Sequence, residues 1–129
     1  MLSALPPILI AEDEALLREL LSLDIHQRGY PVVLTGDGFE TIKAIERQPP
    51  AVLLLDLLMP KMDGYGVLEY VRRKGYDFLV IILSNLRDPQ EQERCTKLGA
   101  KAFLVKSNLD GGDIWTMVQE YLPAGIAKT

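Results

Sequence analysis

Short apolar runs alternate with amphipathic stretches along the whole chain. The runs are Pro7–Ala11, Pro31–Thr35, Ala51–Leu55, Phe78–Leu83 and Ala102–Val105. The first, third and fourth contain uninterrupted stretches of aliphatic residues. Strands that are buried on both faces of a parallel sheet have this composition. The runs therefore predict five strands of a mainly parallel sheet.

The first two stretches between these runs repeat apolar residues at helical spacing. One is predicted to be a helix that ends at Gly29 and whose apolar face carries Leu16, Leu17, Leu20 and Leu21. The next starts with Asp37-Gly38-Phe39-Glu40, which fits a capping box. In that helix Phe39, Ile42 and Ile45 are expected to face inward.

Three more helices are predicted further along the chain. Asp63 is expected to cap the third helix, and Asp88 followed by Pro89 marks the start of the fourth. The fifth is indicated by Ile114, Met117, Val118 and Tyr121, which recur at helical spacing before Pro123 and Gly125. Five strands that alternate with five helices indicate an α/β fold with a mainly parallel sheet.

Composition narrows the classes of function. A length of 129 residues suits one domain. A net charge of −4 without a basic run argues against binding of nucleic acid. The apolar runs are too short to span a membrane. The only cysteine, Cys95, excludes an internal disulfide and suits a reducing cytosol, and a single histidine, His26, argues against a zinc site.

Polar side chains follow four of the predicted strands. Glu12-Asp13-Glu14 follows the first, Asp56 the third, Ser84 the fourth and Lys106 the fifth. Parallel sheets place their functional groups at these carboxyl ends. Clustered carboxylates repel one another unless a cation intervenes, and Mg²⁺ commonly takes one or two carboxylates together with phosphate oxygens. A carboxylate can attack phosphorus, while a lysine and a hydroxyl stabilise the transferring group, so the set fits phosphoryl transfer onto a carboxylate.

These residues resemble the motif set of bacterial response-regulator receiver domains. The matching features are Glu12-Asp13, the segment Asp-Leu-Leu-Met-Pro-Lys-Met-Asp-Gly from Asp56 to Gly64, Ser84, Phe103 and Lys106. The resemblance extends from Pro7 to about Leu122. It implies a flavodoxin-like (βα)5 three-layer sandwich with a five-stranded parallel sheet in the order 2-1-3-4-5. It also implies a single receiver domain over residues 1–129, with its core at about 7–122 and a short tail at 123–129.

The resemblance also implies a role for each matched residue. Asp56 is expected to be the phospho-acceptor. Mg²⁺ is expected to bind Asp13, Asp56 and the backbone carbonyl of Leu58, with Glu12 acting through a metal-bound water. Lys106 and Ser84 are expected to assist at the phosphoryl group, and Ser84 and Phe103 to change position on activation.

A receiver domain of this kind acts as a phosphorylation-dependent switch in a two-component system or phosphorelay. The resemblance implies that a sensor histidine kinase or phosphotransfer protein supplies a phosphohistidine, and that the signal leaves through the fourth helix, fifth strand and fifth helix. The domain would assist its own phosphorylation without being a turnover enzyme. Because seven residues follow Leu122, we expect output through an unidentified protein target or phosphorylation-linked self-association. A cytoplasmic location without direct contact to nucleic acid or membrane is expected.

The sequence departs from the family pattern near the site. Lys106 is followed by Ser107, where the family usually has proline. Leu58 and Leu86 stand two residues after Asp56 and Ser84, at positions that are often polar in the family. Branched apolar side chains there are expected to exclude water and to slow loss of the phosphate.

Three other functions compete with this interpretation. A phosphorylation-independent interaction module on the same scaffold stays open because of the Ser107 departure. A hydrolase of the haloacid-dehalogenase type needs its nucleophilic aspartate after the first strand with a second acid two residues on, whereas Asp56 follows the third strand and Leu58 stands two residues on. A flavodoxin-like flavin module is disfavoured because Glu12-Asp13-Glu14 would repel the flavin phosphate.

Overall fold

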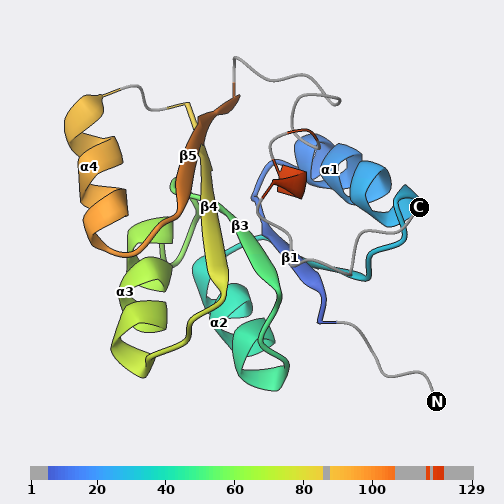
Figure 1. Cartoon of the computed structure of the whole chain (residues 1–129), viewed down its shortest axis with the longest axis horizontal. Coiled ribbons are helices and arrows are strands. Elements are labelled where there is room, and N and C mark those ends of the chain that lie inside the picture. The colour runs from blue at the N-terminus through green and yellow to red at the C-terminus, as the bar shows by residue number, and fades with distance from the viewer. Residues whose placement is uncertain (1–5, 86–87, 107–115, 117, 121–129) are drawn as a thin grey trace.

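Five parallel strands form one sheet in the computed structural model, which describes residues 6–85, 88–106, 116 and 118–120 (Figure 1). The strands are β1 (Ile8–Ala11), β2 (Val32–Thr35), β3 (Val52–Asp56), β4 (Leu79–Ser84) and β5 (Ala102–Val105). Their order across the sheet is β2-β1-β3-β4-β5. The predicted flavodoxin-like sheet and its strand order are therefore confirmed.

Helices cover both faces of this sheet. They are α1 (Ala15–Gln27), α2 (Gly38–Arg47), α3 (Gly64–Lys74) and α4 (Pro89–Lys97). Figure 1 shows α1 on one side of the sheet and α2, α3 and α4 on the other. Of the predicted fifth helix, Ile114, Met117 and Tyr121 lie outside the described residues, while Val118 is buried on the α1 side.

The strand residues divide the core into two layers. Ile8 and Ile10 of β1 pack on the α1 side, whereas Leu9 and Ala11 pack on the side of α2 and α3. Successive side chains of a strand point to opposite faces, so a strand covered on both sides must be apolar at every position. All five residues of β3 are buried, so Asp56 lies at the end of a fully buried strand.

Three of the predicted helix caps are present. Asp37 accepts a hydrogen bond from the backbone N–H of Glu40 at 2.9 Å, and Glu40 Oε1 accepts one from the N–H of Gly36 at 2.9 Å. Asp63 and Asp88 likewise accept from backbone N–H groups in the first turns of α3 and α4. These bonds fix where each helix begins, directly after the loops that follow β2, β3 and β4.

The predicted apolar face of α1 is wrong in part. Leu21 is buried together with Ile25, but Leu16 and Leu20 are 74% and 55% exposed. At 3.6 residues per turn, Leu16 and Leu20 project about 100° or more away from the line that joins Leu21 to Ile25. The helix contains two rows of leucines, and only one of them can face the sheet. The other row, continued by Leu23, remains on the surface.

Phe39 also differs from the prediction, because it is 50% exposed. The buried residues of α2 are Gly38, Thr41 and Ile45, with Ile42 packed at the margin of the core. Phe39 lies roughly a third of a turn from the centre of that face. Spacing alone placed Phe39 in the same row as Ile42 and Ile45, but the helix is rotated so that the row is covered only at its far end.

Candidate functional site

The polar residues predicted from the strand ends meet at the carboxyl edge of the sheet. Glu12 follows β1, Asp56 and Ser84 are the last residues of β3 and β4, and Lys106 follows β5. Glu12, Asp56 and Ser84 are almost fully buried, with exposed fractions of 0%, 2% and 1%. The acids lie in adjacent strands because β1 is hydrogen-bonded to β3.

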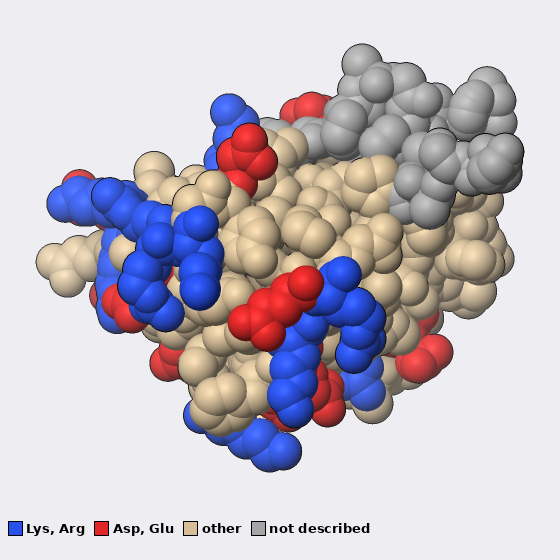
Figure 2. Space-filling view, turned by 90° about the horizontal axis from the view of Figure 1, so that it is seen from below, with Lys and Arg blue, Asp and Glu red and all other residues tan. Residues whose placement is uncertain are grey.

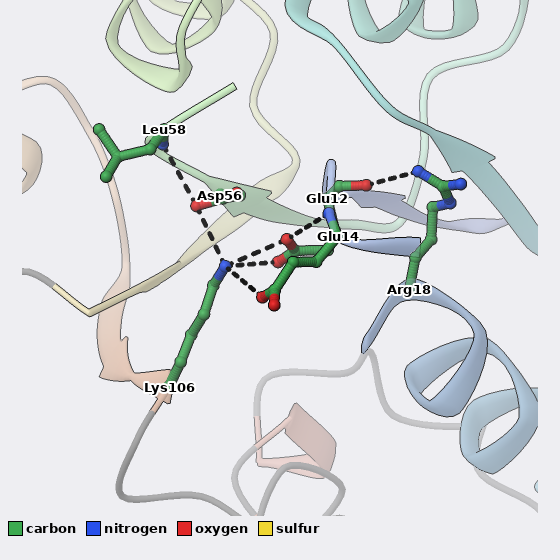
Figure 3. A network of polar contacts seen from close by, with 6 residues as sticks. All are labelled: Glu12, Glu14, Arg18, Asp56, Leu58 and Lys106. Atoms are coloured by element: carbon green, nitrogen blue, oxygen red, sulfur yellow. Dashed lines mark hydrogen bonds and ion pairs between the residues drawn. The ribbon is translucent and has the colours of Figure 1, made fainter. Parts of the chain in front are cut away.

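Lys106 joins the acids of this edge (Figure 3). Its Nζ lies 2.9 Å from Glu12 Oε1, 3.4 Å from Asp56 Oδ1 and 3.8 Å from Glu14 Oε1. It also donates a hydrogen bond to Glu12 Oε2 at 3.1 Å. Burial alone would lower the pKa of Lys106, but the bond to Glu12 and the charge of Asp56 outweigh it and raise that pKa. The ammonium group is therefore held in its charged form between the two buried carboxylates.

Asp56 has an unusual proton affinity for a carboxyl group. Burial, followed by the charge of Glu12, raises the pKa of Asp56 to about 7, although Lys106 and a hydrogen bond from the Leu58 N–H at 3.2 Å act in the opposite direction. Each of these two opposing contacts favours the carboxylate. A perturbed carboxyl that is buried at a strand end beside a lysine is a candidate nucleophile or proton-transfer group.

Glu12, Asp13 and Asp56 form the acidic cluster. Each of the three offers a carboxylate oxygen, and the three oxygens lie within 4.8 Å of one another. Asp13 is exposed, whereas Glu12 and Asp56 are buried. Hard divalent cations such as Mg²⁺ prefer oxygen ligands and commonly use only one or two carboxylates. The donor set therefore fits Mg²⁺, with Asp13 and Asp56 as carboxylate ligands and Glu12 engaged by Lys106.

Two residues in this network, Arg18 and Glu14, make contacts that were not predicted from the sequence. The Arg18 guanidinium donates a hydrogen bond to the backbone carbonyl oxygen of Glu12 at 2.8 Å. The Glu14 carboxylate lies near Lys106, and the Glu14 N–H donates to Glu12 Oε2 at 3.0 Å. Position after a strand identified the acids, but an arginine in the first turn of the next helix looks like any surface residue. Its contact becomes apparent only when the loop is folded.

The other predicted site residues are distributed around this network. Ser84 is buried at the end of β4, and Phe103 is half-buried, packed against the core layer of α3. Leu58 is 60% exposed, and the predicted exclusion of water by its side chain stays a prediction. Leu86 and Ser107 lie outside the described residues, so the predictions for them stay predictions.

Basic side chains gather at the opposite end of the molecule. Figure 2 views the face that lies below in Figure 1, and lysines and arginines form groups there. Arg47 ends α2, and Arg72, Arg73 and Lys74 occupy the last turn of α3. Cations are favoured at helix C-termini by the helix dipole. The acidic cluster thus lies at the opposite edge of the sheet from these basic groups.

Comparison with known proteins decides the family. The family model described as the response regulator receiver domain matches residues 8–119. The chain belongs to this family. Receiver domains are signalling domains of two-component systems, and the predicted resemblance is confirmed. No helix among the residues that the structure describes has the length and apolar character needed to cross a membrane.

Curated relatives of this chain are described as regulators. A curated relative from Porphyridium aerugineum, "Probable transcriptional regulator ycf27", is 37% identical over 99 residues, which are 77% of this chain and 41% of that protein. "Response regulator RR06" from Streptococcus pneumoniae is 34% identical over 99 residues, which are 77% of this chain and 45% of that protein. The chain therefore matches less than half the length of these relatives.

Solved receiver structures have the same fold. A DNA-binding response regulator of the LuxR family from Staphylococcus aureus aligns with a TM-score of 0.82 and 27% identity, covering 91% of this chain and 98% of that one. The chemotaxis protein CheY4 from Vibrio cholerae aligns with a TM-score of 0.84 and 23% identity, covering 92% of this chain and all of that one. The second likeness bears on the fold alone.

Proposed function

We propose that this receiver domain is a phosphorylation-dependent switch whose phospho-acceptor is Asp56. The observation that carries the proposal is the position of the Asp56 carboxylate. It is buried at the end of β3, 3.4 Å from the Lys106 ammonium and within the acidic cluster. Membership of the receiver family supports the same assignment.

The chemistry is transfer of a phosphoryl group between two nucleophiles. An oxygen of the Asp56 carboxylate attacks the phosphorus of a phosphohistidine and forms a P–O bond. The P–N bond breaks, its electron pair stays on the imidazole nitrogen, and the donor histidine is restored. The buried Ser84 ends β4, the strand next to β3, and Lys106 follows β5, the next strand in the sheet. They are proposed to contact the phosphoryl oxygens, whose charge must be neutralised during transfer.

Mg²⁺ is proposed as the cofactor, held by Asp13, Asp56 and the Leu58 backbone carbonyl. When bound, it would neutralise charge on the phosphoryl oxygens. Glu12 would act outside the direct ligand set, because its carboxylate already accepts hydrogen bonds from Lys106 and the Glu14 N–H. The exposed Asp13 leaves the cluster open to solvent on one side, which gives a cation and a phosphodonor a route to Asp56.

The phosphodonor is proposed to be a sensor histidine kinase or a phosphotransfer protein, with acetyl phosphate as a small-molecule alternative. A surface pocket beside the site is lined by Glu14, Leu16, Leu17, Leu20, Asn85 and Lys106. The exposed leucines of α1 thus border the lysine that contacts Asp56. Large exposed apolar side chains beside a polar site are typical of protein-interaction surfaces. A helical donor could rest on α1 while its histidine reaches Asp56.

Output is proposed to pass through α4, β5 and the segment that follows. Ser84 ends β4 five residues before α4 begins at Pro89. Movement of Ser84 toward a phosphoryl group would therefore displace the start of that helix. The receiving partner is proposed to be another protein or a second copy of this chain, in the cytoplasm. Phosphorylation then acts by biasing a two-state equilibrium.

The test is phosphorylation by phosphoramidate, a small donor that contains a P–N bond. In the presence of Mg²⁺ we expect intact mass spectrometry to show a gain of one phosphoryl group, and addition of EDTA to prevent the gain. Asp13→Asn should reduce the rate of labelling by weakening the metal site. A chain that stays unlabelled with Mg²⁺ present would identify a phosphorylation-independent interaction module instead.

A further inference from the structure

Arg18 reaches from α1 back to the loop that carries the acidic pair. Its Nη1 donates a hydrogen bond to the Glu12 carbonyl oxygen at 2.8 Å. Figure 3 shows Arg18 and Lys106 approaching Glu12 from opposite sides, Arg18 at the backbone and Lys106 at the carboxylate. The backbone N–H of Glu12 is also held, because it donates to the carbonyl oxygen of Thr35 in β2 at 3.0 Å. Both backbone polar groups of Glu12 are therefore fixed.

The fixed carbonyl bears directly on Asp13. The Glu12 carbonyl and the Asp13 N–H belong to one planar peptide group, so a bond that orients the first also orients the second. The chain turns here from a fully buried residue to an exposed one, since Glu12 is 0% exposed and Asp13 lies on the surface. A rotation of this peptide group would move the Asp13 carboxylate relative to the Asp56 carboxylate. In the proposed metal site both carboxylates bind the same cation, so their relative position matters.

Gly36 provides the space that the Arg18 guanidinium occupies. A Cβ atom built on Gly36 would lie 3.0 Å from Arg18 Nη1 and 3.9 Å from Glu40 Oε1. Gly36 is not among the described glycines with positive φ, so alanine is compatible with its backbone. A Cβ atom there would be in tight contact with the guanidinium that bonds the Glu12 carbonyl, so the guanidinium would have to shift by a few tenths of an ångström.

We propose that Arg18 is a positioning residue that orients the Glu12–Asp13 peptide group and thereby sets the affinity of the acidic cluster for a divalent cation. Gly36 serves the same purpose by leaving space for the guanidinium. The inference rests on the proposed metal site but assigns residues outside its ligand set. Residues that orient metal ligands influence affinity without touching the metal.

Two single variants break the same contact from different sides. Arg18→Met removes the donor and keeps most of the apolar stem, and Gly36→Ala pushes the guanidinium away. The probe is Mn²⁺, whose free aqueous form is counted by electron paramagnetic resonance, with Mg²⁺ added as competitor. We expect each variant to bind Mn²⁺ about tenfold more weakly than the parent. Arg47→Met, an exposed arginine at the far end of α2, is the matched control and should bind as the parent does.

A double variant and a stability measurement separate positioning from folding. If Gly36→Ala acts through Arg18, combining it with Arg18→Met should weaken binding no further than either change alone, because coupled sites are not additive. Urea unfolding in EDTA should show losses too small to account for the change in affinity. Parent-like affinity in both single variants, additive losses in the double variant, or weakened binding explained by partial unfolding would each overturn the proposal. A parent protein that binds no divalent cation would instead refute the proposed metal site.

Discussion

The acidic cluster lies at the carboxyl edge of the sheet, and α4 begins after the loop that leaves this edge. The two differ in the burial of the contacts that hold them in place. Glu12 and Asp56 are buried charges, and their contacts with the half-buried Lys106 link the ends of β1, β3 and β5. In α4 only Cys95 is buried. The helix contacts α3 through exposed or half-buried polar groups.

Three contacts join α4 to α3. The Tyr65 hydroxyl of α3 donates to the Glu91 carboxylate, and the Arg94 guanidinium lies 3.9 Å from the centre of the Tyr65 ring. Arg72 of α3 donates to the carbonyl oxygen of Lys97. Contacts of this kind are individually weak and can be exchanged for water. Elements that move in signalling come from the less stable parts of a fold, so this difference suits a rigid site beside a movable helix.

The largest expected effect comes from breaking the buried cluster at Lys106. Lys106→Met leaves Glu12 and Asp56 buried without a cation between them, which should lower the free energy of unfolding by about 3–5 kcal/mol at neutral pH without metal. Urea denaturation in EDTA measures the loss. Adding Asp56→Asn to Lys106→Met should recover much of it, because one of the two carboxylates is then gone. A Lys106→Met protein as stable as the parent would show that burial of the Glu12 and Asp56 carboxylates does not destabilise the fold.

A smaller effect is expected from the proton on Asp56. Its pKa is about 7 in the folded chain and returns to an ordinary 3.8 on unfolding, so between these values the folded state binds more protons. The free energy of unfolding should therefore fall as the pH rises from 3.8 to 7, by about 4 kcal/mol at most.

Asp56→Asn should abolish this pH dependence. In EDTA at pH 8 the variant should be more stable than the parent by up to about 4 kcal/mol, and the two should converge near pH 4. Mg²⁺ should narrow the difference at pH 8, because it stabilises only the parent's carboxylate cluster. If the variant is less stable than the parent at pH 8, the carboxylate is not destabilised by its burial.

The smallest effect is expected from breaking a contact between α4 and α3. Tyr65→Phe removes the hydroxyl that bonds Glu91 and should cost about 1 kcal/mol. The change should be local, so hydrogen exchange should accelerate in Pro89–Lys97 while the amides of β3 keep their protection. Glu93→Gln is the matched control, since in the part of the chain that the structure describes the Glu93 carboxylate pairs with the exposed Lys97 of its own helix at 3.8 Å. Uniform acceleration throughout the chain would mean that α4 is as firmly integrated as the sheet.

The same contrast explains what could be predicted from the sequence. The positions of Asp56 and Lys106 were predicted correctly because each residue directly follows an apolar run that is typical of a buried strand. The carboxyl ends of parallel strands lie at the same edge of the sheet. Leu16 and Phe39 were misplaced because helical spacing defines a row of side chains without saying which row meets the sheet. Arg18 was missed because its partner is a backbone carbonyl, which leaves no trace in the pattern of residue types.

The central claim is that Asp56 itself receives the phosphoryl group, and chemical trapping tests it directly. After phosphorylation by phosphoramidate with Mg²⁺, borohydride reduces an aspartyl phosphate to homoserine, and peptide sequencing by mass spectrometry locates the changed residue. The account predicts homoserine at position 56, and none there when EDTA is present during phosphorylation. Homoserine at Asp13 or Asp63, or a phosphoryl group that resists borohydride, would contradict the assignment.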